Sequence, residues 1–228
     1  DFKIPTQVFN ILPMEKQNFY DLNFDQLKAF LIEKAEVEPK KAKMRSQQLF
    51  NAVYKKNIKS FDELTTFGVE LRDKIKDLIS LEKPKIIDVQ KSKDGTIKFL
   101  LELKDKRNVE TVLIPDKSQS RYTICLSVSV GCYLSCEFCA TAQISKKLVR
   151  NLSPGEIISQ IILSKDYIND WSTQKKITNQ VLMGEGSPFL NLDNVKIAID
   201  NSKNKDGLEY GRTRITVSTV GVGIKKDN

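Results

Sequence analysis

All four cysteines of the chain lie within one short segment, from Cys125 to Cys139. Three of them, Cys132, Cys136 and Cys139, are separated by three and two residues, so their thiolates can converge from a single loop. Thiolates hold iron–sulfur clusters, and three protein ligands on a four-iron cluster leave one iron open to bind a substrate. The chain contains no histidine, which excludes Ser-His and Cys-His nucleophile pairs and every His-ligated metal site. The spacing predicts a [4Fe–4S] cluster.

A structural zinc site is the alternative for the same residues, with Cys125 as the fourth ligand. Zinc sites usually pair their cysteines as two short hooks separated by a longer stretch. Here three cysteines occupy one eight-residue loop, directly after the apolar run Tyr122–Val130, which we expect to form a strand. A single loop after a strand favours the iron–sulfur cluster over zinc.

A series of short motifs surrounds the cysteines. They are VETVLIP at 109–115, RYTIC at 121–125, VGC at 130–132, FCATA at 138–142, RNLS at 150–153, VLMG at 181–184, NLDNV at 191–195 and RITVST at 214–219. This series resembles the RlmN family of radical S-adenosylmethionine (SAM) RNA methyltransferases and the related Cfr enzymes. The resemblance implies an enzyme that methylates carbon 2 of adenine in 23S rRNA, with tRNA as a second candidate substrate. It also implies an electron donor such as flavodoxin.

The resemblance assigns roles to individual residues. Cys132, Cys136 and Cys139 would hold the cluster, whose open iron chelates SAM. Cys125 would form the disulfide that releases the methylated product, and Glu110 would accept a proton. Without the resemblance, Cys125 is more typical of a buried strand residue and Glu110 of a solvent-facing one.

The predicted SAM-binding segment departs from the family pattern. The family has Gly-Glu-Pro here; Gly186 and Pro188 match it, and Ser187 stands in place of the glutamate. A hydroxyl accepts a hydrogen bond from an ammonium group more weakly than a carboxylate does, and Glu185 is one candidate to compensate. The resemblance also implies that Ser218 contacts the cofactor; the alternative is an ordinary hydroxyl at a strand end.

The family continues well past the last residue of this sequence, to a cysteine that carries the transferred methyl group. No cysteine follows Cys139 here. We therefore expect a truncated or split form that does not turn over alone, with a separate chain carrying the remaining part. Two alternatives stay open. One is a non-catalytic RNA-binding remnant with an iron–sulfur or zinc site, and the other is a different radical SAM enzyme, against which the segment from Glu110 to Cys125 argues.

Hydrophobic periodicity predicts the elements that position these residues. Residues 1–84 are expected to form a small helical accessory domain. Asn23 can cap a first helix, and a second helix follows Pro39. The capping-box spacing of Ser60–Glu63 predicts a third helix that begins there and reaches Leu78.

Residues 85–228 are expected to form the radical SAM core, with about the first three βα units. Three β-rich runs come first, and Asp94-Gly95 predicts a hairpin between two of them. Strands and helices then alternate, which is typical of parallel βαβ units. The fold class is α/β: a partial, truncated (β/α) radical SAM barrel, preceded by the helical domain and a short β segment. The predicted strands are 86–89, 97–103, 109–114, 122–130, 177–183 and 214–218, and the predicted helices begin at Ser153 and near Leu192.

Composition and charge indicate the class of protein and the kind of partner to expect. Hydrophobic residues make up 40% of the 228 residues and charged residues 29%, as in a globular protein. The net charge of +8 favours polyanions such as RNA, although a general lysine bias gives the same value. No apolar run is long enough to span a bilayer, and residues 1–13 lack the features of a signal peptide. We expect a cytoplasmic protein without a membrane partner.

Overall fold

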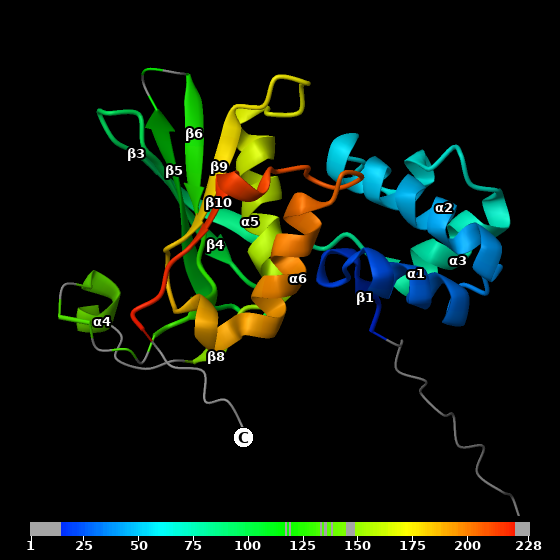
Figure 1. Cartoon of the computed structure of the whole chain (residues 1–228), viewed down its shortest axis with the longest axis horizontal. Helices are drawn as coiled ribbons and strands as arrows, with labels where there is room; N and C mark the ends of the chain where they lie inside the picture. Colours follow the sequence, from blue (N-terminus) through cyan, green and yellow to red (C-terminus); the bar gives the residue numbers. More distant parts are fainter. Residues whose placement is uncertain are drawn as a thin grey trace, which may run out of the picture.

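The computed structural model describes residues 15–116, 118, 120–132, 134, 136–137, 139–144 and 149–221. Its centre is a six-stranded sheet in the order β10-β9-β6-β5-β4-β3 (Figure 1). Pairs β3–β4, β4–β5 and β5–β6 are antiparallel, and β6–β9 and β9–β10 are parallel. These strands are β3 (Lys85–Lys91), β4 (Ile97–Glu102), β5 (Asn108–Asp116), β6 (Arg121–Cys125), β9 (Ile177–Leu182) and β10 (Ile215–Val217).

The β segment that precedes the parallel strands extends the same sheet. Strand β5 pairs with β6 so that Val112 lies opposite Cys125. The predicted hairpin joins β3 to β4, and Gly95 in its turn has a φ of +95°, which glycine adopts without strain. Strands β3 and β10 are the two edge strands and do not pair with each other. The described strands therefore form an open, partial sheet rather than a closed barrel.

The apolar run that was expected to form one strand over 122–130 is divided in the structure. Strand β6 ends at Cys125, and the short β7 (Ser129–Val130) pairs instead with β8 (Arg150–Asn151). Between them the chain turns toward the segment after β9, because the Val128 and Ser129 amides donate to the Glu185 carbonyl at 2.8 and 3.2 Å. The apolar composition of this run indicates that it is buried, but it does not indicate the residue at which the chain leaves the sheet.

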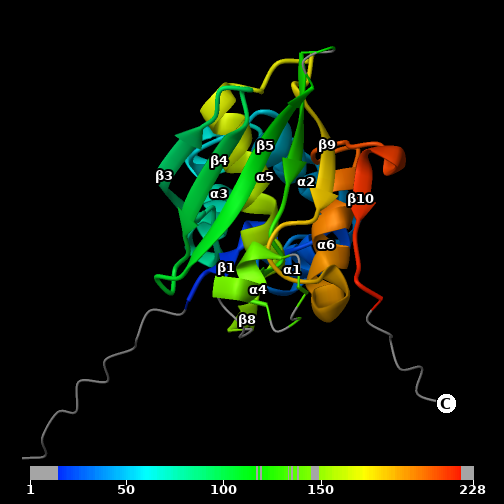
Figure 2. The same cartoon turned by 90° about the vertical axis from the view of Figure 1, so that its left-hand side faces the viewer.

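Two helices cover one face of the sheet, α5 (Pro154–Ile168) and α6 (Leu192–Lys203). Helix α5 begins with a capping box in which the Ser153 hydroxyl accepts from the Glu156 amide. Its isoleucines 157, 158, 161 and 162 are each at most 1% exposed. Figure 2 shows the other face, with these helices behind the strands and the short α4 (Ala140–Ile144) near one end. We call this uncovered side the open face.

A helical region packs on the far side of α5 and α6 from the sheet (Figure 1). As predicted, Asn23 caps α1 in a capping box with Gln26, and α2 begins at Pro39. The two-residue strands β1 and β2 pair in parallel near its ends. The elements are β1 (Gln17–Asn18), η1 (Phe19–Asp21), α1 (Phe24–Glu33), α2 (Pro39–Phe50), η2 (Asn51–Lys55), η3 (Phe61–Glu63), α3 (Val69–Leu78) and β2 (Ile79–Ser80).

The prediction that the third helix begins at Ser60 is wrong. The Ser60–Glu63 capping box is present, but it caps only the three-residue 3-10 turn η3. Helix α3 begins separately after Gly68, whose ψ of 152° is extended. Thr65, Thr66 and Gly68 are weak helix formers, so the segment between the two elements does not continue the first turn.

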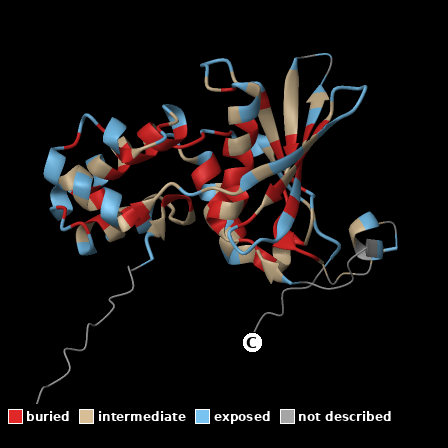
Figure 3. Ribbon diagram, turned by 180° about the vertical axis from the view of Figure 1, so that it is seen from behind, coloured by how far each residue is buried: buried red, intermediate tan, exposed pale blue. Residues whose placement is uncertain are grey.

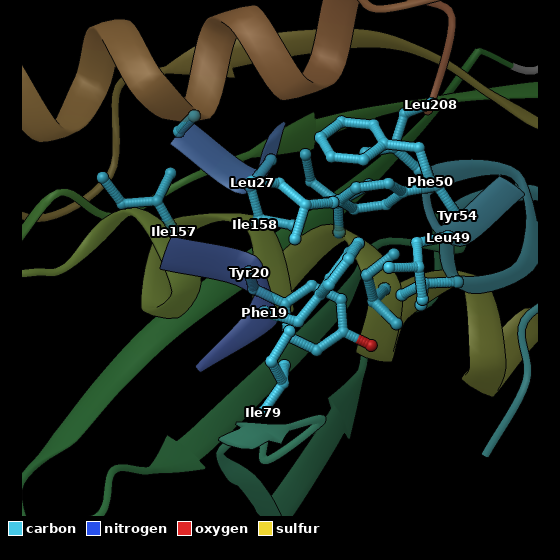
Figure 4. Close-up of a cluster of buried hydrophobic side chains, with 14 of the residues drawn as sticks. Phe19, Tyr20, Leu27, Leu49, Phe50, Tyr54, Ile79, Ile157, Ile158 and Leu208 are labelled. Carbon is cyan, nitrogen blue, oxygen red and sulfur yellow. The ribbon is translucent and has the colours of Figure 1, made fainter. Parts of the chain in front are cut away.

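The helical region and the sheet share one core. Figure 4 shows Ile157 and Ile158 of α5 in the same cluster as Phe19, Tyr20 and Phe50 of the helical region. Figure 3 shows the same distribution, with buried residues along α5 and the sheet and exposed residues on the outer helices. Within the described part of the chain, no helix is long and apolar enough to cross a membrane.

Candidate active site

The predicted site residues gather at one edge of the sheet. Strands β6, β9 and β10 are parallel, so their carboxyl ends meet at this edge, where α/β sheets commonly bind ligands. The cysteine loop follows β6 and β7, residues 183–188 follow β9, and Ser218 directly follows β10. Three segments that are far apart in the sequence therefore surround one region.

Glu110 and Cys125 lie on the open face at that edge. Cross-strand partners share a face, and Cys125 is paired with Val112, which is two residues from Glu110 on β5. The intervening Thr111 points the other way and bonds to Gln160 of α5. The Glu110 carboxylate forms an exposed ion pair with Lys98, at an Nζ–Oε1 distance of 2.9 Å. Sheet register thus brings the two predicted catalytic groups together.

Burial raises the pKa of the Cys125 thiol above its ordinary value, against a smaller lowering by a hydrogen bond with the backbone of Met183. A raised pKa keeps the thiol protonated near neutral pH. The thiol is free and half-buried. It is therefore available for redox chemistry without being a strongly activated nucleophile.

The predicted cluster ligands lie in the loop between β7 and α4. Cys132, Cys136 and Cys139 are free and half-buried, and the Cys139 amide donates to the Cys136 carbonyl at 3.0 Å. Of the residues that the structure describes, no three Cys, Asp or Glu side chains are arranged to hold a metal ion. The donor set nevertheless fits an iron–sulfur cluster in type, because it offers three unpaired thiols from one loop and no imidazole.

The glycines after β9 bring this segment against the loop that follows β6. A Cβ added to Gly184 would lie 2.8 Å from the Leu126 carbonyl carbon. Gly186 has a φ of +94°, and a Cβ there would overlap the Ser129 hydroxyl. Only glycine permits this close approach at both positions. The segment after β9 therefore packs directly against the backbone that leads into the cysteine loop.

Glu185, between the two glycines, contacts the start of the cysteine loop. Its Oε1 accepts a hydrogen bond from the Gly131 amide at 2.8 Å, and Gly131 immediately precedes Cys132. Burial raises the pKa of the carboxyl group, the Gly131 bond lowers it, and the nearby Glu110 raises it further. Sequence reasoning placed Glu185 near the cofactor but did not foresee its bond to the cysteine loop.

The other two predicted cofactor contacts differ in their surroundings. Ser187 is only 6% exposed, and its hydroxyl has no hydrogen-bond partner among the residues described. Ser218 is half-buried just past the end of β10, at the same edge of the sheet. An unpartnered buried hydroxyl is uncommon and is consistent with a group that is satisfied when a ligand is present.

Comparison with known proteins identifies the family. The model described as "Ribosomal RNA large subunit methyltransferase N-terminal domain" matches residues 17–81. "Dual-specificity RNA methyltransferase RlmN" of Oleidesulfovibrio alaskensis is 39% identical over 202 residues, which are 89% of this chain and 54% of that protein. The chain belongs to the RlmN family. The RlmN of Rhizorhabdus wittichii is also 39% identical, over 88% of this chain and 50% of its own length.

A solved structure supports the same fold. A "radical SAM methyltransferase from Sphaerobacter thermophilus" superposes with a TM-score of 0.75 and 31% identity, over 89% of this chain and 57% of that one. The α/β fold class is therefore confirmed. The chain spans about half the length of the curated RlmN proteins that it matches. The division at residues 84 and 85 and the roles of the individual site residues stay predictions.

A buried polar network behind the candidate site was missed by sequence reasoning. The Gln160 side chain accepts from the Ser127 amide at 2.9 Å and donates to the Ser127 carbonyl at 2.9 Å. The Ser127 hydroxyl in turn donates to the Glu110 carbonyl at 2.6 Å and accepts from the Glu185 amide at 3.1 Å. The signal was available, because Gln160 and the adjacent Ser159 are polar residues between the isoleucine pairs of α5.

The asparagines of the NLDNV motif at 191–195 make hydrogen bonds to segments on both sides of the cysteine loop. The Asn191 side-chain amide donates to the Val128 and Leu152 carbonyls, each at 2.8 Å. Asn194 donates to the same Leu152 carbonyl at 3.0 Å. These bonds fix the segments on both sides of the cysteine loop to the start of α6.

Proposed function

We propose that this chain supplies the cluster-binding and cofactor-binding part of a radical SAM enzyme that methylates carbon 2 of adenine in RNA. The observation that carries the proposal is the placement of Glu110 and Cys125 on the open face, at the edge where the cysteine loop begins. A generic radical SAM core needs the cysteine loop but not this preceding pair. The similarity to RlmN proteins over 89% of the chain supports the same reaction class.

The three loop cysteines are proposed to hold a [4Fe–4S] cluster, and residues 184–188 and Ser218 to bind SAM. Together these groups supply a carbon radical able to attack an unreactive ring position. Glu110, whose exposed carboxylate pairs with Lys98 on the open face, is proposed to accept a proton from the adenine. Cys125, on the same face and with a raised thiol pKa, is proposed to form the disulfide that frees the product.

RNA is the proposed substrate, with 23S rRNA and tRNA as the two candidates. The net charge of +8 supports a polyanionic partner. A cytoplasmic electron donor of the flavodoxin type and a second segment that carries the methylated cysteine complete the proposal. No cysteine follows Cys139 within these 228 residues, which span about half the length of the RlmN proteins that they match.

The test is anaerobic reconstitution of the chain with iron and sulfide, followed by metal analysis and incubation with SAM and dithionite. We expect about four irons per chain by the cluster type and formation of 5′-deoxyadenosine. Cys136→Ala should abolish both, whereas the matched Cys125→Ala variant should keep both. Stoichiometric zinc without iron or sulfide would contradict the proposal and favour a non-catalytic zinc-containing RNA-binding protein.

A further inference from the structure

Glu185 is a half-buried carboxylate at the centre of the site without a cation beside it. One oxygen accepts from the Gly131 amide at 2.8 Å. Within the described residues, Glu185 takes part in no ion pair, and its second oxygen has no hydrogen-bond partner. Glu110, the charged group that interacts with it, is also an acid and has its own cation in Lys98. Buried charges are normally paired, so this carboxylate is suited to a cationic group from a ligand.

The residue two positions later does not offer the same chemistry. Ser187 is 6% exposed, and its hydroxyl has no partner in the described structure. A serine side chain is short, carries no charge and forms a weaker bond with an ammonium group than a carboxylate does. Position 187 is where the SAM-binding glutamate was expected from the resemblance to the family.

We propose that Glu185 recognises the amino group of SAM in this chain, in place of a glutamate at position 187. Its Oε1 holds the cysteine loop through Gly131, and its other oxygen accepts from the ligand's ammonium group. The proposal rests on the proposed function, since it requires the chain to bind SAM. It adds that one carboxylate joins the cofactor segment to the loop of the cluster ligands.

The Glu185→Gln variant tests the proposed contact with the ligand's ammonium group separately from the contact with the Gly131 amide. The amide oxygen of glutamine still accepts from the Gly131 amide, but its NH2 group is a donor and repels an ammonium group. Equilibrium dialysis of the cluster-loaded chain against SAM should show an affinity at least about tenfold lower, as expected for a lost charge-assisted hydrogen bond. Iron content should be unchanged. Affinity for 5′-methylthioadenosine, which lacks the amino-acid part of SAM, should also be unchanged.

Position 187 supplies the matched controls. Ser187→Ala removes only an uncharged hydroxyl and should lower the affinity for SAM far less than Glu185→Gln does, and Ser187→Glu introduced into the Glu185→Gln variant should restore affinity. Wild-type affinity for SAM in Glu185→Gln, or an equal loss in Ser187→Ala, would overturn the inference. Failure of the wild-type chain to bind either a cluster or SAM would instead overturn the proposed function itself, so the two failures are distinguishable.

Discussion

At Cys125 the local environment controls the state of a single thiol. The residue ends β6 and is half-buried on the open face, and burial is the main cause of its raised pKa. A thiol in this state reacts slowly near neutral pH, because the thiolate is the reactive form. Slow intrinsic reactivity is compatible with the disulfide-forming role that we propose for Cys125.

The first prediction concerns the alkylation of this thiol. In a variant with Cys132, Cys136 and Cys139 replaced by alanine, Cys125 is the remaining thiol. The rate of its reaction with iodoacetamide should rise with pH, with a midpoint above that of the same chain unfolded in urea. The folded pKa is the raised one, so the midpoint must shift upward. Mass spectrometry of quenched samples measures it, and a midpoint at or below the unfolded value would contradict the shift.

Glu185 shows how one side chain can serve two segments. Its carboxylate lies 54 residues along the chain from the Gly131 amide that it holds. Exposed single hydrogen bonds contribute little, but a half-buried bond to a charged acceptor is among the stronger ones. The position of the cysteine loop therefore depends on a residue outside that loop.

At the scale of elements, α5 fixes the loop after β6 through Gln160. The side chain is fully buried and makes hydrogen bonds with Ser127 and Thr111. Because Ser127 also contacts Glu110 and Glu185, one helix positions both predicted catalytic and cofactor-binding segments. A helix gives a rigid base for such a network, since its own backbone is fully hydrogen-bonded.

Replacing Gln160 with leucine tests this network. Leucine fills a similar volume with an apolar side chain, but it leaves the Ser127 amide and carbonyl without their hydrogen-bond partner. Each unsatisfied buried group costs about 1–3 kcal/mol, so we expect a loss of about 2–4 kcal/mol in the free energy of unfolding. Urea unfolding followed by circular dichroism measures it.

Ser159 provides the control on the same helix. It is equally buried, but its hydroxyl has no partner among the described residues. Ser159→Ala should change the free energy of unfolding by less than about 0.5 kcal/mol, because no bond is lost. An equal effect of the two substitutions would show that the Gln160 network is not stabilising.

At the scale of the whole molecule, the helical region and the sheet are joined by a polar cluster as well as by a shared core. Asp166 of α5 accepts from Asn57 at 2.7 Å, from Lys59 at 2.9 Å and from the Trp171 indole at 2.9 Å. Lys83 lies 3.6 Å away, in the segment that leads into the sheet. Burial pushes the pKa of Asp166 up, but the bonds from Lys59 and Asn57 outweigh it and leave the pKa lowered.

Asp166→Ala should therefore loosen the helical region from the sheet. We expect a loss of about 2 kcal/mol near neutral pH, typical of several hydrogen bonds to one charged group. The folded pKa lies below the unfolded one, so this contribution is present above the unfolded pKa. It is lost as pH falls through the folded pKa, and the difference between the variant and the wild type should shrink in acid. The single tryptophan, Trp171, reports the change by fluorescence.

Asp193→Ala is the matched control for this interface. Asp193 is 97% exposed and faces Lys196 across 3.8 Å on α6. Exposed pairs of this kind contribute little, so stability should change by less than about 0.5 kcal/mol. A pH-independent difference between Asp166→Ala and the wild type would contradict the assignment of the effect to the carboxylate.

The sequence alone determined the features that depend on short spacing. Capping residues correctly predicted the starts of α1 and α5, and the spacing of three cysteines within one eight-residue loop predicts an iron–sulfur cluster, which stays a prediction. These features follow from bonds between residues three or four positions apart, which periodicity and residue type record. The prediction of a helix beginning at Ser60 was wrong, although it also rested on short spacing. A cap specifies the first turn of a helix and not its length.

Only the tertiary structure decided which distant groups meet. The register between β5 and β6 puts Glu110 and Cys125 on one face, and a shift of one residue would separate them. The Glu185 bond to Gly131 and the Gln160 network join residues that are 54 and 33 positions apart. Such contacts arise from packing of the whole core, which composition and local spacing do not encode in any single segment.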